Sequence, residues 1–390
     1  MIYLDNNATT RVAPEVLDAM KPYLGEFFGN PSSAHALGRE MKRAVEHARE
    51  QVATLIGAAE PGEIVFTSCG SESDNWAIRG VLATQPSKKH IVTTQVEHEA
   101  VRNLCRSLEN DGYEVTWLGV DQNGELDLDS LRAALRPDTA LVSTMMANNE
   151  TGVLFPIDKI GRIVRENSEA TFHVDGVQAV GKIPVDLKNT AVDLFALSGH
   201  KLYAPQGVGA LYVRRGVSLP PLILGGAQEQ GRRAGTYAVP NIVALGAACQ
   251  LALDDNCHAR VEALRDRLET GILTQIPNTR LNGVADRSKR TPNTANISFE
   301  YVDGQSILLY LDEAGICVST GSACHSSSHE SSPTLRAMNV PYTAAQGSIR
   351  FSLGRYNTEA EIETTLSILP GIIAKLAAMS PYQEELARSI

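Results

Sequence analysis

The sequence has 390 residues, of which 43% are hydrophobic and 21% are charged, and its formal net charge is -10. This length allows two domains with separate cores, because single hydrophobic cores stop growing near about 250 to 300 residues. The composition is that of an ordinary folded protein, and the acidic charge argues against nucleic acid or an anionic membrane as a general partner. No apolar run approaches the ~20 residues that span a bilayer, and the N-terminus lacks the features of a signal peptide, so we expect a cytoplasmic protein.

The six cysteines are spread along the chain without CxxC spacing. This pattern is not typical of a disulfide framework or of a closed zinc site. The cysteines are residues 69, 105, 249, 257, 317 and 324. We therefore expect free thiols, and at least one of them is a candidate reactive group.

The first part of the chain predicts a strand, a helix, a second strand and a second helix. A turn at residues 6–10 follows a short apolar start, and apolar residues at helical spacing predict a helix over residues 39–56. A strand over residues 63–68 leads to Gly70 and Ser71, which open the next helix. Free backbone N–H groups and a hydroxyl at a helix N-terminus suit an anion, so both residues are candidate phosphate ligands. Ser71 could instead be only a structural cap.

The following strands end in polar residues. Strands are predicted over residues 90–94, 115–120 and 139–145. His98, just after the first of them, could stack on the ring of a cofactor and exchange protons, or it could be a satisfied loop histidine. Alternation of strands with helical stretches continues to residue 215 and predicts a mostly parallel, doubly wound sheet.

Two further strand ends carry an acid and a lysine. A strand over residues 171–175 ends in Asp175, and an apolar strand over residues 194–197 leads to Lys201. Ligands in such sheets lie beyond the carboxyl ends of the strands. Pyridoxal phosphate needs a lysine for its Schiff base and an acid that keeps its ring nitrogen protonated, so this pair predicts that cofactor. A structural ion pair between the two residues is the alternative.

Three polar residues beside this pair extend the prediction. Gln178 lies three residues after Asp175 and could hydrogen-bond the phenolic oxygen of the cofactor. Ser198 and His200, on either side of Gly199, could donate to its phosphate.

The last third of the chain has shorter elements. A loop over residues 225–236 contains Arg232 and Arg233, which could face solvent or an anion. A charged, hairpin-like helical region is predicted over residues 257–276. The further predictions are strands over residues 295–299, 316–319 and 348–353 and helices over residues 305–313 and 359–379. We expect a large domain of residues 12–256 and a smaller α+β domain of residues 1–11 and 257–390.

Cys324 lies in a run of small and polar residues from 320 to 330. Structural cysteines usually lie in a core, so this one is more typical of a nucleophile on a flexible arm. Cys317, on an apolar strand, is expected in the core. His325 and His329 have the spacing of a metal-binding pair on a helix, but their serine-rich surroundings disfavour a helix, and we expect no metal.

Together these stretches resemble the pyridoxal-phosphate cysteine desulfurases of iron–sulfur cluster assembly, in the long-loop group of the class V aminotransferase family. The matching motifs occur in the family's order and run nearly end to end. They are YLDNNATT at residues 3–10, GNPSS at 29–33, FTS at 66–68, NNETG at 148–152, HVD at 173–175, SGHK at 198–201 and GSAC at 321–324. Residues 147–157 and 231–236 look most like the NifS type of nitrogen fixation rather than the housekeeping, IscS-like branch.

The resemblance implies a fold type I homodimer like aspartate aminotransferase, with a mostly parallel seven-stranded α/β sheet and a smaller α+β domain. Its implied phosphate ligands are Gly70, Ser71, Ser198 and His200, with Thr236 reaching the cofactor of the partner subunit. Its implied ring ligands are Asn148, Asp175, Gln178 and the stacking His98, with Lys201 bearing the cofactor. Arg350 and Asn148 are the implied substrate ligands, and Cys324 is the implied sulfur acceptor.

The implied reaction converts L-cysteine to L-alanine and leaves a persulfide on Cys324, with Lys201 as the base for the α proton. The persulfide would serve a sulfur-acceptor scaffold protein of the NifU or IscU type. The sequence departs from the family pattern at Ser71, where threonine is more common, at Thr320, which replaces a serine, and after Cys324. The alternatives are a selenocysteine lyase, another aminotransferase-type pyridoxal enzyme, or a non-catalytic sulfur carrier with the same fold.

Overall fold

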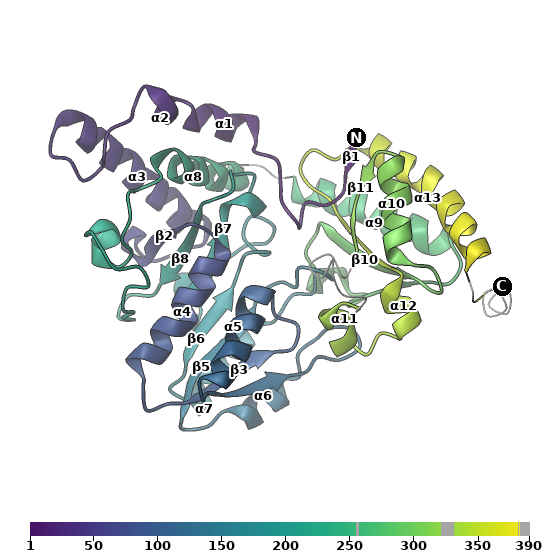
Figure 1. Ribbon diagram of the computed structural model, residues 1–390, viewed down its shortest axis with the longest axis horizontal. Coiled ribbons are helices and arrows are strands. Elements are labelled where there is room, and N and C mark those ends of the chain that lie inside the picture. Colours follow the sequence, from purple (N-terminus) through teal and green to yellow (C-terminus); the bar gives the residue numbers. More distant parts are fainter. Residues whose placement is uncertain (255–256, 321–330, 381, 383–390) are drawn as a thin grey trace.

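The computed structural model describes residues 1–254, 257–320, 331–380 and 382. Figure 1 shows a larger body with a central sheet and a smaller body that contains the first strand and the last helix. The chain begins at β1 (Ile2–Tyr3) in the smaller body and crosses to α1 (Pro14–Met20) in the larger one. The division of the chain into domains at residues 11/12 and 256/257 stays a prediction.

In the described part of the chain, the central sheet has seven strands in the order β2-β8-β7-β6-β5-β3-β4. Strand β8 runs antiparallel to both of its neighbours, and the other pairs are parallel. The bounds are β2 (Ile64–Thr67), β3 (His90–Thr94), β4 (Glu114–Leu118), β5 (Thr139–Met145), β6 (Thr171–Asp175), β7 (Leu194–Ser198) and β8 (Gly209–Val213). The predicted mostly parallel sheet is therefore confirmed.

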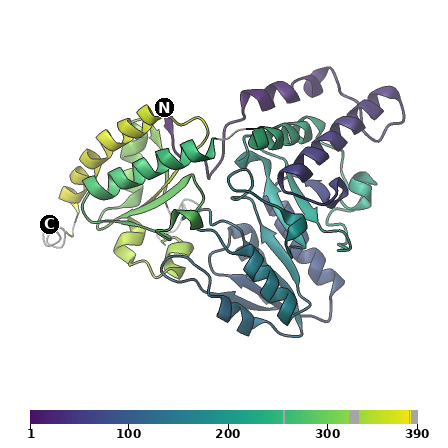
Figure 2. The same ribbon diagram turned by 180° about the vertical axis from the view of Figure 1, so that it is seen from behind.

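Helices cover both faces of this sheet. Ile91 and Leu141 belong to a core shared with α4 and α5, whereas Val92 and Val142 belong to a core on the opposite face. Burial on both faces explains why the strands are nearly continuous apolar runs. The helices are α1, α2 (Pro22–Gly25), α3 (Ala36–Leu55), α4 (Gly70–Thr84), α5 (Glu99–Asn110), α6 (Leu128–Ala134), α7 (Ile157–Asn167) and α8 (Val239–Asp254). Figure 2, the view from behind, shows the face covered by α3 and α7.

A second sheet organises the smaller body. Its described strands have the antiparallel order β12-β13-β10-β9, with bounds β12 (Ser319–Thr320), β13 (Ser348–Ser352), β10 (Thr294–Phe299) and β9 (Thr279–Leu281). The helices are α9 (His258–Gln275), α10 (Gly304–Glu313), α11 (Pro333–Ala337), α12 (Tyr342–Gln346) and α13 (Glu359–Met379). Phe299 and Phe351 on the sheet pack in one core with residues of α9, α10 and α13.

Two predictions for the smaller body were wrong about the type or the continuity of an element. Residues 258–275 form the single helix α9 and not a hairpin. The strand predicted over residues 316–319 is divided, because β11 (Ile316–Cys317) pairs with β1 while β12 pairs with β13. The chain changes sheets between them.

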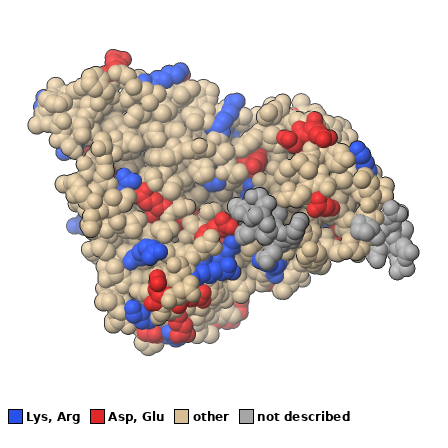
Figure 3. All heavy atoms as spheres, viewed as in Figure 1, with Lys and Arg blue, Asp and Glu red and all other residues tan. Residues whose placement is uncertain are grey.

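Helix α13 is long and apolar enough, by length and composition, to cross a membrane. Its apolar residues include Ile362, Leu369 and Ile373, which are buried in the core of the smaller body. These residues form the face of the helix that packs against the rest of the smaller body. On the face seen in Figure 3, acidic and basic side chains are interspersed.

The segment between β1 and α1, called the crossing segment below, joins the two bodies of the molecule. The backbone N–H of Asn6 donates to the carbonyl of Ser352 at 3.0 Å, in the smaller body. Four residues later, the N–H of Thr10 donates to the carbonyl of His200 at 2.9 Å, at the end of β7. Residues 7 and 8 are therefore held between the central sheet and the second sheet.

Candidate active site

A cavity of about 410 Å³ lies at the carboxyl ends of the central strands, next to the smaller body. Most of the residues predicted from the sequence line it. These are Gly70, Ser71, His98, Asp175, Gln178, Ser198, His200, Lys201 and Arg350. Strands β6 and β7, the segments that directly follow them, and the N-termini of α4 and α5 deliver eight of these residues, and β13 delivers Arg350.

The N-terminus of α4 forms one end of the cavity. Cys69 caps this helix in an extended conformation, and among the described residues no side chain caps its N–H groups. A Cβ at Gly70 would lie 2.8 Å from Val177 Cγ2 and 3.6 Å from Ser198 Cβ, so a side chain would fill the space there. With the hydroxyls of Ser71 and Ser198 nearby, this arrangement suits a phosphate group.

Lys201 follows β7 in the short helix Gly199–Lys201 and is half-buried. Its Nζ donates to the backbone carbonyls of Asn7 at 2.6 Å and of Ala8 at 2.7 Å. The amine is thus held by the crossing segment and points into the cavity.

Burial, together with the nearby charge of Lys201, lowers the pKa of His200 to about 4, so His200 is neutral at pH 7.

Asp175 ends β6 and is buried. Its Oδ1 accepts from the N–H of Val177 at 2.9 Å. Burial raises the pKa of Asp175, whereas His98 and Lys201 oppose that rise. A buried carboxylate that needs a cationic or N–H partner suits the protonated ring nitrogen of pyridoxal phosphate.

His98 lies at the start of α5. Its Nδ1 accepts from the N–H of Ala100 at 3.2 Å, which fixes the ring as the helix cap. Burial lowers the pKa of His98 although Asp175 acts in the opposite direction, so the imidazole is neutral near pH 7. A neutral histidine with one ring nitrogen engaged can move a proton at the other.

Gln178 is held by residues that the sequence analysis did not single out. Its Nε2 donates to the carbonyl of Asn7 at 3.0 Å, and its Oε1 accepts from Lys182 Nζ at 2.5 Å. Lys182 also donates to Asn7 Oδ1 at 3.0 Å. Burial, with the charges of Lys201 and Arg350, lowers the pKa of Lys182 well below its usual value. The spacing of four residues between Gln178 and Lys182 was the only sequence signal for this contact.

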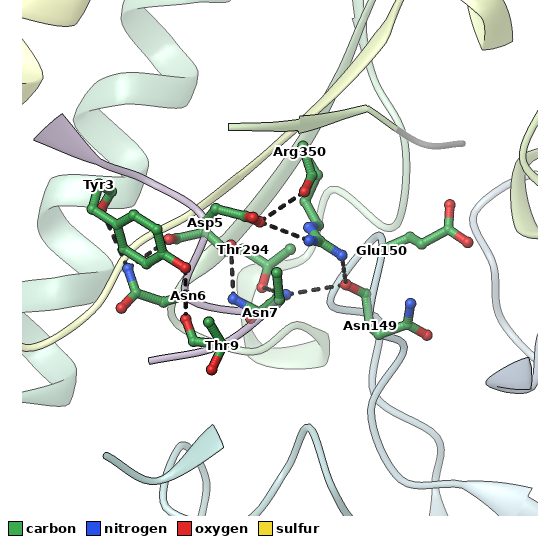
Figure 4. A network of polar contacts seen from close by, with 12 residues as sticks. Tyr3, Asp5, Asn6, Asn7, Thr9, Asn149, Glu150, Thr294 and Arg350 are labelled. Atoms are coloured by element: carbon green, nitrogen blue, oxygen red, sulfur yellow. Dashed lines mark hydrogen bonds and ion pairs between the residues drawn. The ribbon is translucent and has the colours of Figure 1, made fainter. Parts of the chain in front are cut away.

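Arg350 projects from β13 toward the cavity. Its Nη2 donates to Asp5 Oδ1 at 2.8 Å, and its Nη1 donates to the carbonyl of Asn149 at 3.1 Å (Figure 4). The same carbonyl accepts from Asn7 Nδ2 at 3.1 Å. The arginine is thereby fixed between the two bodies of the molecule.

The structure does not bring Asn148 to the cavity. Its Oδ1 accepts from the N–H groups of Glu150 and Thr151 at 3.0 and 2.9 Å, and its Nδ2 donates to the carbonyl of Val96 at 3.2 Å. These bonds use the side chain to close the turn after β5. Among the described residues, Asn149 and not Asn148 lines the cavity.

Other predicted residues are not among the described residues that line the cavity. Thr236 is exposed, and it is not among the described residues that line this cavity. Cys324, His325 and His329 lie outside the described residues. Cys317 is half-buried rather than fully in the core.

Two further buried acids lie at or next to the cavity. Glu97 accepts from Thr94 Oγ1 at 2.6 Å and from the N–H of Met145 at 3.1 Å, and burial raises its pKa to about 8. Asp74, on α4, lines the cavity, and its Oδ1 lies 3.4 Å from His173 Nε2. Burial raises the pKa of Asp74 and lowers that of His173 to about 3.

The residues present fit pyridoxal phosphate. The open N-terminus of α4 with Ser71, Ser198 and His200 provides donors for a phosphate, and Asp175 and Lys201 line the same cavity. The space at Gly70, which a Cβ would fill, lies at the phosphate end. The donor set therefore matches each polar end of that cofactor.

Comparisons with known proteins identify the family of this chain. Residues 2–365 match the family model described as aminotransferase class-V. The chain is 58% identical over 390 residues to cysteine desulfurase 2 of Trichormus variabilis, covering 99% of this chain and 96% of that protein. It is 51% identical over 383 residues to the cysteine desulfurase NifS of Azotobacter vinelandii, covering 98% of this chain and 94% of that protein. Its fold is similar to a solved structure described as a NifS-like protein, with a TM-score of 0.90 and 39% identity, covering 96% of this chain and 100% of that chain.

Proposed function

The chain belongs to the aminotransferase class-V family and is a pyridoxal-phosphate-dependent cysteine desulfurase of the NifS-like kind, and we propose that it removes sulfur from L-cysteine in the cavity around Lys201. The observation that carries this proposal is that one cavity gathers an amine, a buried carboxylate and a guanidinium, from Lys201, Asp175 and Arg350. When bound, the cofactor supplies an electron sink for the substrate carbons.

Lys201 would hold the cofactor covalently and then act as the base. Its Nζ already lies in the cavity, between the carbonyls of Asn7 and Ala8. With substrate bound, the free Nζ would take the α proton of the substrate.

The other cofactor ligands act by position. Asp175 would pair with the ring nitrogen, and Gln178 would face the phenolic oxygen. Gly70, Ser71, Ser198 and His200 would bind the phosphate, and the neutral His98 would stack on the ring and exchange a proton. Arg350, together with Asn149, would bind the carboxylate of L-cysteine, because the planar guanidinium matches a carboxylate through parallel hydrogen bonds.

Cys324 is the proposed sulfur acceptor. Its thiolate attacks the sulfur of the substrate, so that an S–S bond forms on Cys324 as the Cβ–S bond of the substrate breaks. The electron pair left on the substrate is protonated, and L-alanine leaves. The oxidation of the Cys324 thiol to a persulfide is thus balanced by the reduction of the substrate's β-carbon.

The proposed cellular role is the supply of sulfur. Similarity to the NifS protein of Azotobacter vinelandii supports a role in supplying sulfur for iron–sulfur clusters, in nitrogen fixation in particular. The persulfide would pass to a scaffold protein of the NifU or IscU type. We place the protein in the cytoplasm, and fractionation of the source cells would test this.

A homodimer is also part of the proposal. The exposed residues Leu222, Ile223 and Leu224 form an apolar tip, and Leu224 is 83% exposed. The N–H of Ala234 donates to the carbonyl of Ile223 at 3.3 Å, so this tip is joined to the loop that carries Thr236. A partner subunit on this surface would cover the apolar tip and receive Thr236 at its own cofactor phosphate.

Two variants test the function. Lys201→Ala should lose both the visible absorbance of the bound cofactor and the release of alanine from L-cysteine. Cys324→Ala should keep the absorbance and lose sulfur transfer. Full turnover by Cys324→Ala would instead favour another aminotransferase-type activity, and a strong preference for selenocysteine would favour a selenocysteine lyase.

A further inference from the structure

The guanidinium of Arg350 is held by two acceptors, a side-chain carboxylate and a backbone carbonyl. Asp5 Oδ1 accepts from Nη2 at 2.8 Å, and the Asn149 carbonyl accepts from Nη1 at 3.1 Å (Figure 4). The side chains of Arg350 and Asp5 are 9% and 17% exposed. Arg350 lines the cavity, whereas Asp5 is not among the described residues that do. The Asp5 carboxylate therefore holds the arginine without itself lining the cavity.

Asp5 is itself fixed on two sides. Its backbone forms a parallel bridge with Ser352, and the next N–H, of Asn6, donates to the Ser352 carbonyl at 3.0 Å. Its Oδ1 also accepts from Ser319 Oγ at 2.9 Å. Ser319 and Arg350 are directly opposite in the β12–β13 pair. The carboxylate is thus placed by both the crossing segment and the second sheet.

The remaining donors of Arg350 suffice for a second carboxylate. A guanidinium has five N–H groups, and Asp5 and Asn149 each engage one nitrogen. Among the described residues, Nε of Arg350 has no hydrogen-bond partner although it is buried. Because a free arginine side chain has many rotamers, an anchor behind it lowers the cost of presenting these donors to a ligand.

We propose that Asp5 is a positioning residue for substrate recognition, which fixes Arg350 so that its remaining N–H groups face the carboxylate of L-cysteine. The inference rests on the proposed function, in which Arg350 binds that carboxylate. It adds a residue to that function, because the preference for substrates with an α-carboxylate then depends on Asp5, which does not line the cavity.

The test compares Asp5→Ala with Asp5→Asn in the holoenzyme. Asp5→Ala should raise KM for L-cysteine by about tenfold and leave kcat within about threefold, since the lost contact acts on carboxylate binding. The affinity for L-alanine, measured by the change in cofactor absorbance without turnover, should fall by a similar factor. Asp5→Asn keeps an acceptor oxygen for Arg350 and Ser319 and should recover most of this affinity.

The matched control is Asp18→Ala, since Asp18 is an exposed acid on α1 that pairs with Lys21. It should bind L-alanine like the wild type. Two results would show that the inference is wrong. In the first, Asp5→Ala and Asp5→Asn both keep the wild-type affinity for L-alanine and have a KM for L-cysteine that is unchanged or lower. In the second, both variants lose kcat alone. If the wild type itself releases no alanine from L-cysteine, it is the proposed function that fails, and the L-alanine titration still reports on Asp5.

Discussion

At the scale of single residues, the chemistry depends on which groups at the site are charged. Burial lowers the pKa values of His98 and His200, the latter to about 4 with a contribution from Lys201, so both are neutral at pH 7. A neutral His98 can accept a proton, and a neutral His200 adds no second positive charge beside Lys201. Burial raises the pKa of Asp175, and the N–H of Val177 and the charge of Lys201 act against that rise.

Glu97 gives a prediction for the pH dependence of stability. Its pKa rises from 4.5 to about 8 in the folded protein because it is buried. The protonated form is therefore favoured by folding, and its contribution to stability is present below pH 4.5 and lost as the pH rises through 8. Over this pH range the free energy of unfolding should therefore fall by at most about 5 kcal/mol.

Glu97→Gln should remove this dependence, since glutamine does not titrate and keeps an oxygen for Thr94 and for the N–H of Met145. Urea unfolding at pH 5, 7 and 9 measures it. The variant should gain stability relative to the wild type as the pH increases. A difference that stays constant across the three pH values would contradict this assignment.

At the scale of elements, the N-terminus of α4 is decisive for the cofactor. Gly70→Ala would place a Cβ 2.8 Å from Val177 Cγ2, at the phosphate end of the cavity. We expect the affinity for pyridoxal phosphate to fall by about tenfold or more, since an anion site at a helix N-terminus needs close approach of its N–H groups.

The measurement is equilibrium binding of the cofactor, followed by its absorbance. Gly62→Ala is the control, because nothing lies within 4 Å of the added Cβ. Unchanged cofactor affinity in Gly70→Ala would mean that the phosphate lies elsewhere.

The elements also show what a sequence pattern can predict. The apolar runs at residues 90–94 and 139–145 are strands with those bounds, because burial on both faces leaves a clear signal. The strand predicted at residues 316–319 is in fact two strands in two sheets. An apolar run shows that its residues are buried but not which sheet they join, since pairing is decided by distant segments.

At the scale of the whole molecule, the site is assembled from segments far apart in the sequence. The residues at strand ends, such as Asp175 and Lys201, could be predicted, because their side chains follow buried runs and reach one edge of the sheet. Asp5, Asn7 and Lys182 could not, since their roles come from contacts across the fold. The one-position difference between Asn148 and Asn149 has the same origin, because the turn decides which side chain faces inward.

The dimer gives a prediction at this scale. Leu224→Asp should dissociate the proposed dimer, because it places a charge on the exposed apolar tip. The cofactor should then bind more weakly, since Thr236 no longer reaches a partner's phosphate. Analytical ultracentrifugation and cofactor titration measure the two effects.

Leu309→Asp is the control, because Leu309 is also exposed, at 60%, but lies on α10 of the smaller body. It should remain a dimer. A dimeric Leu224→Asp variant with full cofactor affinity would contradict the proposed interface.

The central claim is that this cavity transfers sulfur from L-cysteine to Cys324. A single-turnover reaction of the holoenzyme with L-cysteine tests it most directly, with alanine release and the mass of the Cys324 peptide measured together. We predict one alanine for each sulfur atom gained by Cys324. Formation of pyruvate or another keto acid, with Cys324 unmodified, would contradict the sulfur-transfer mechanism and leave only the fold and the cofactor site.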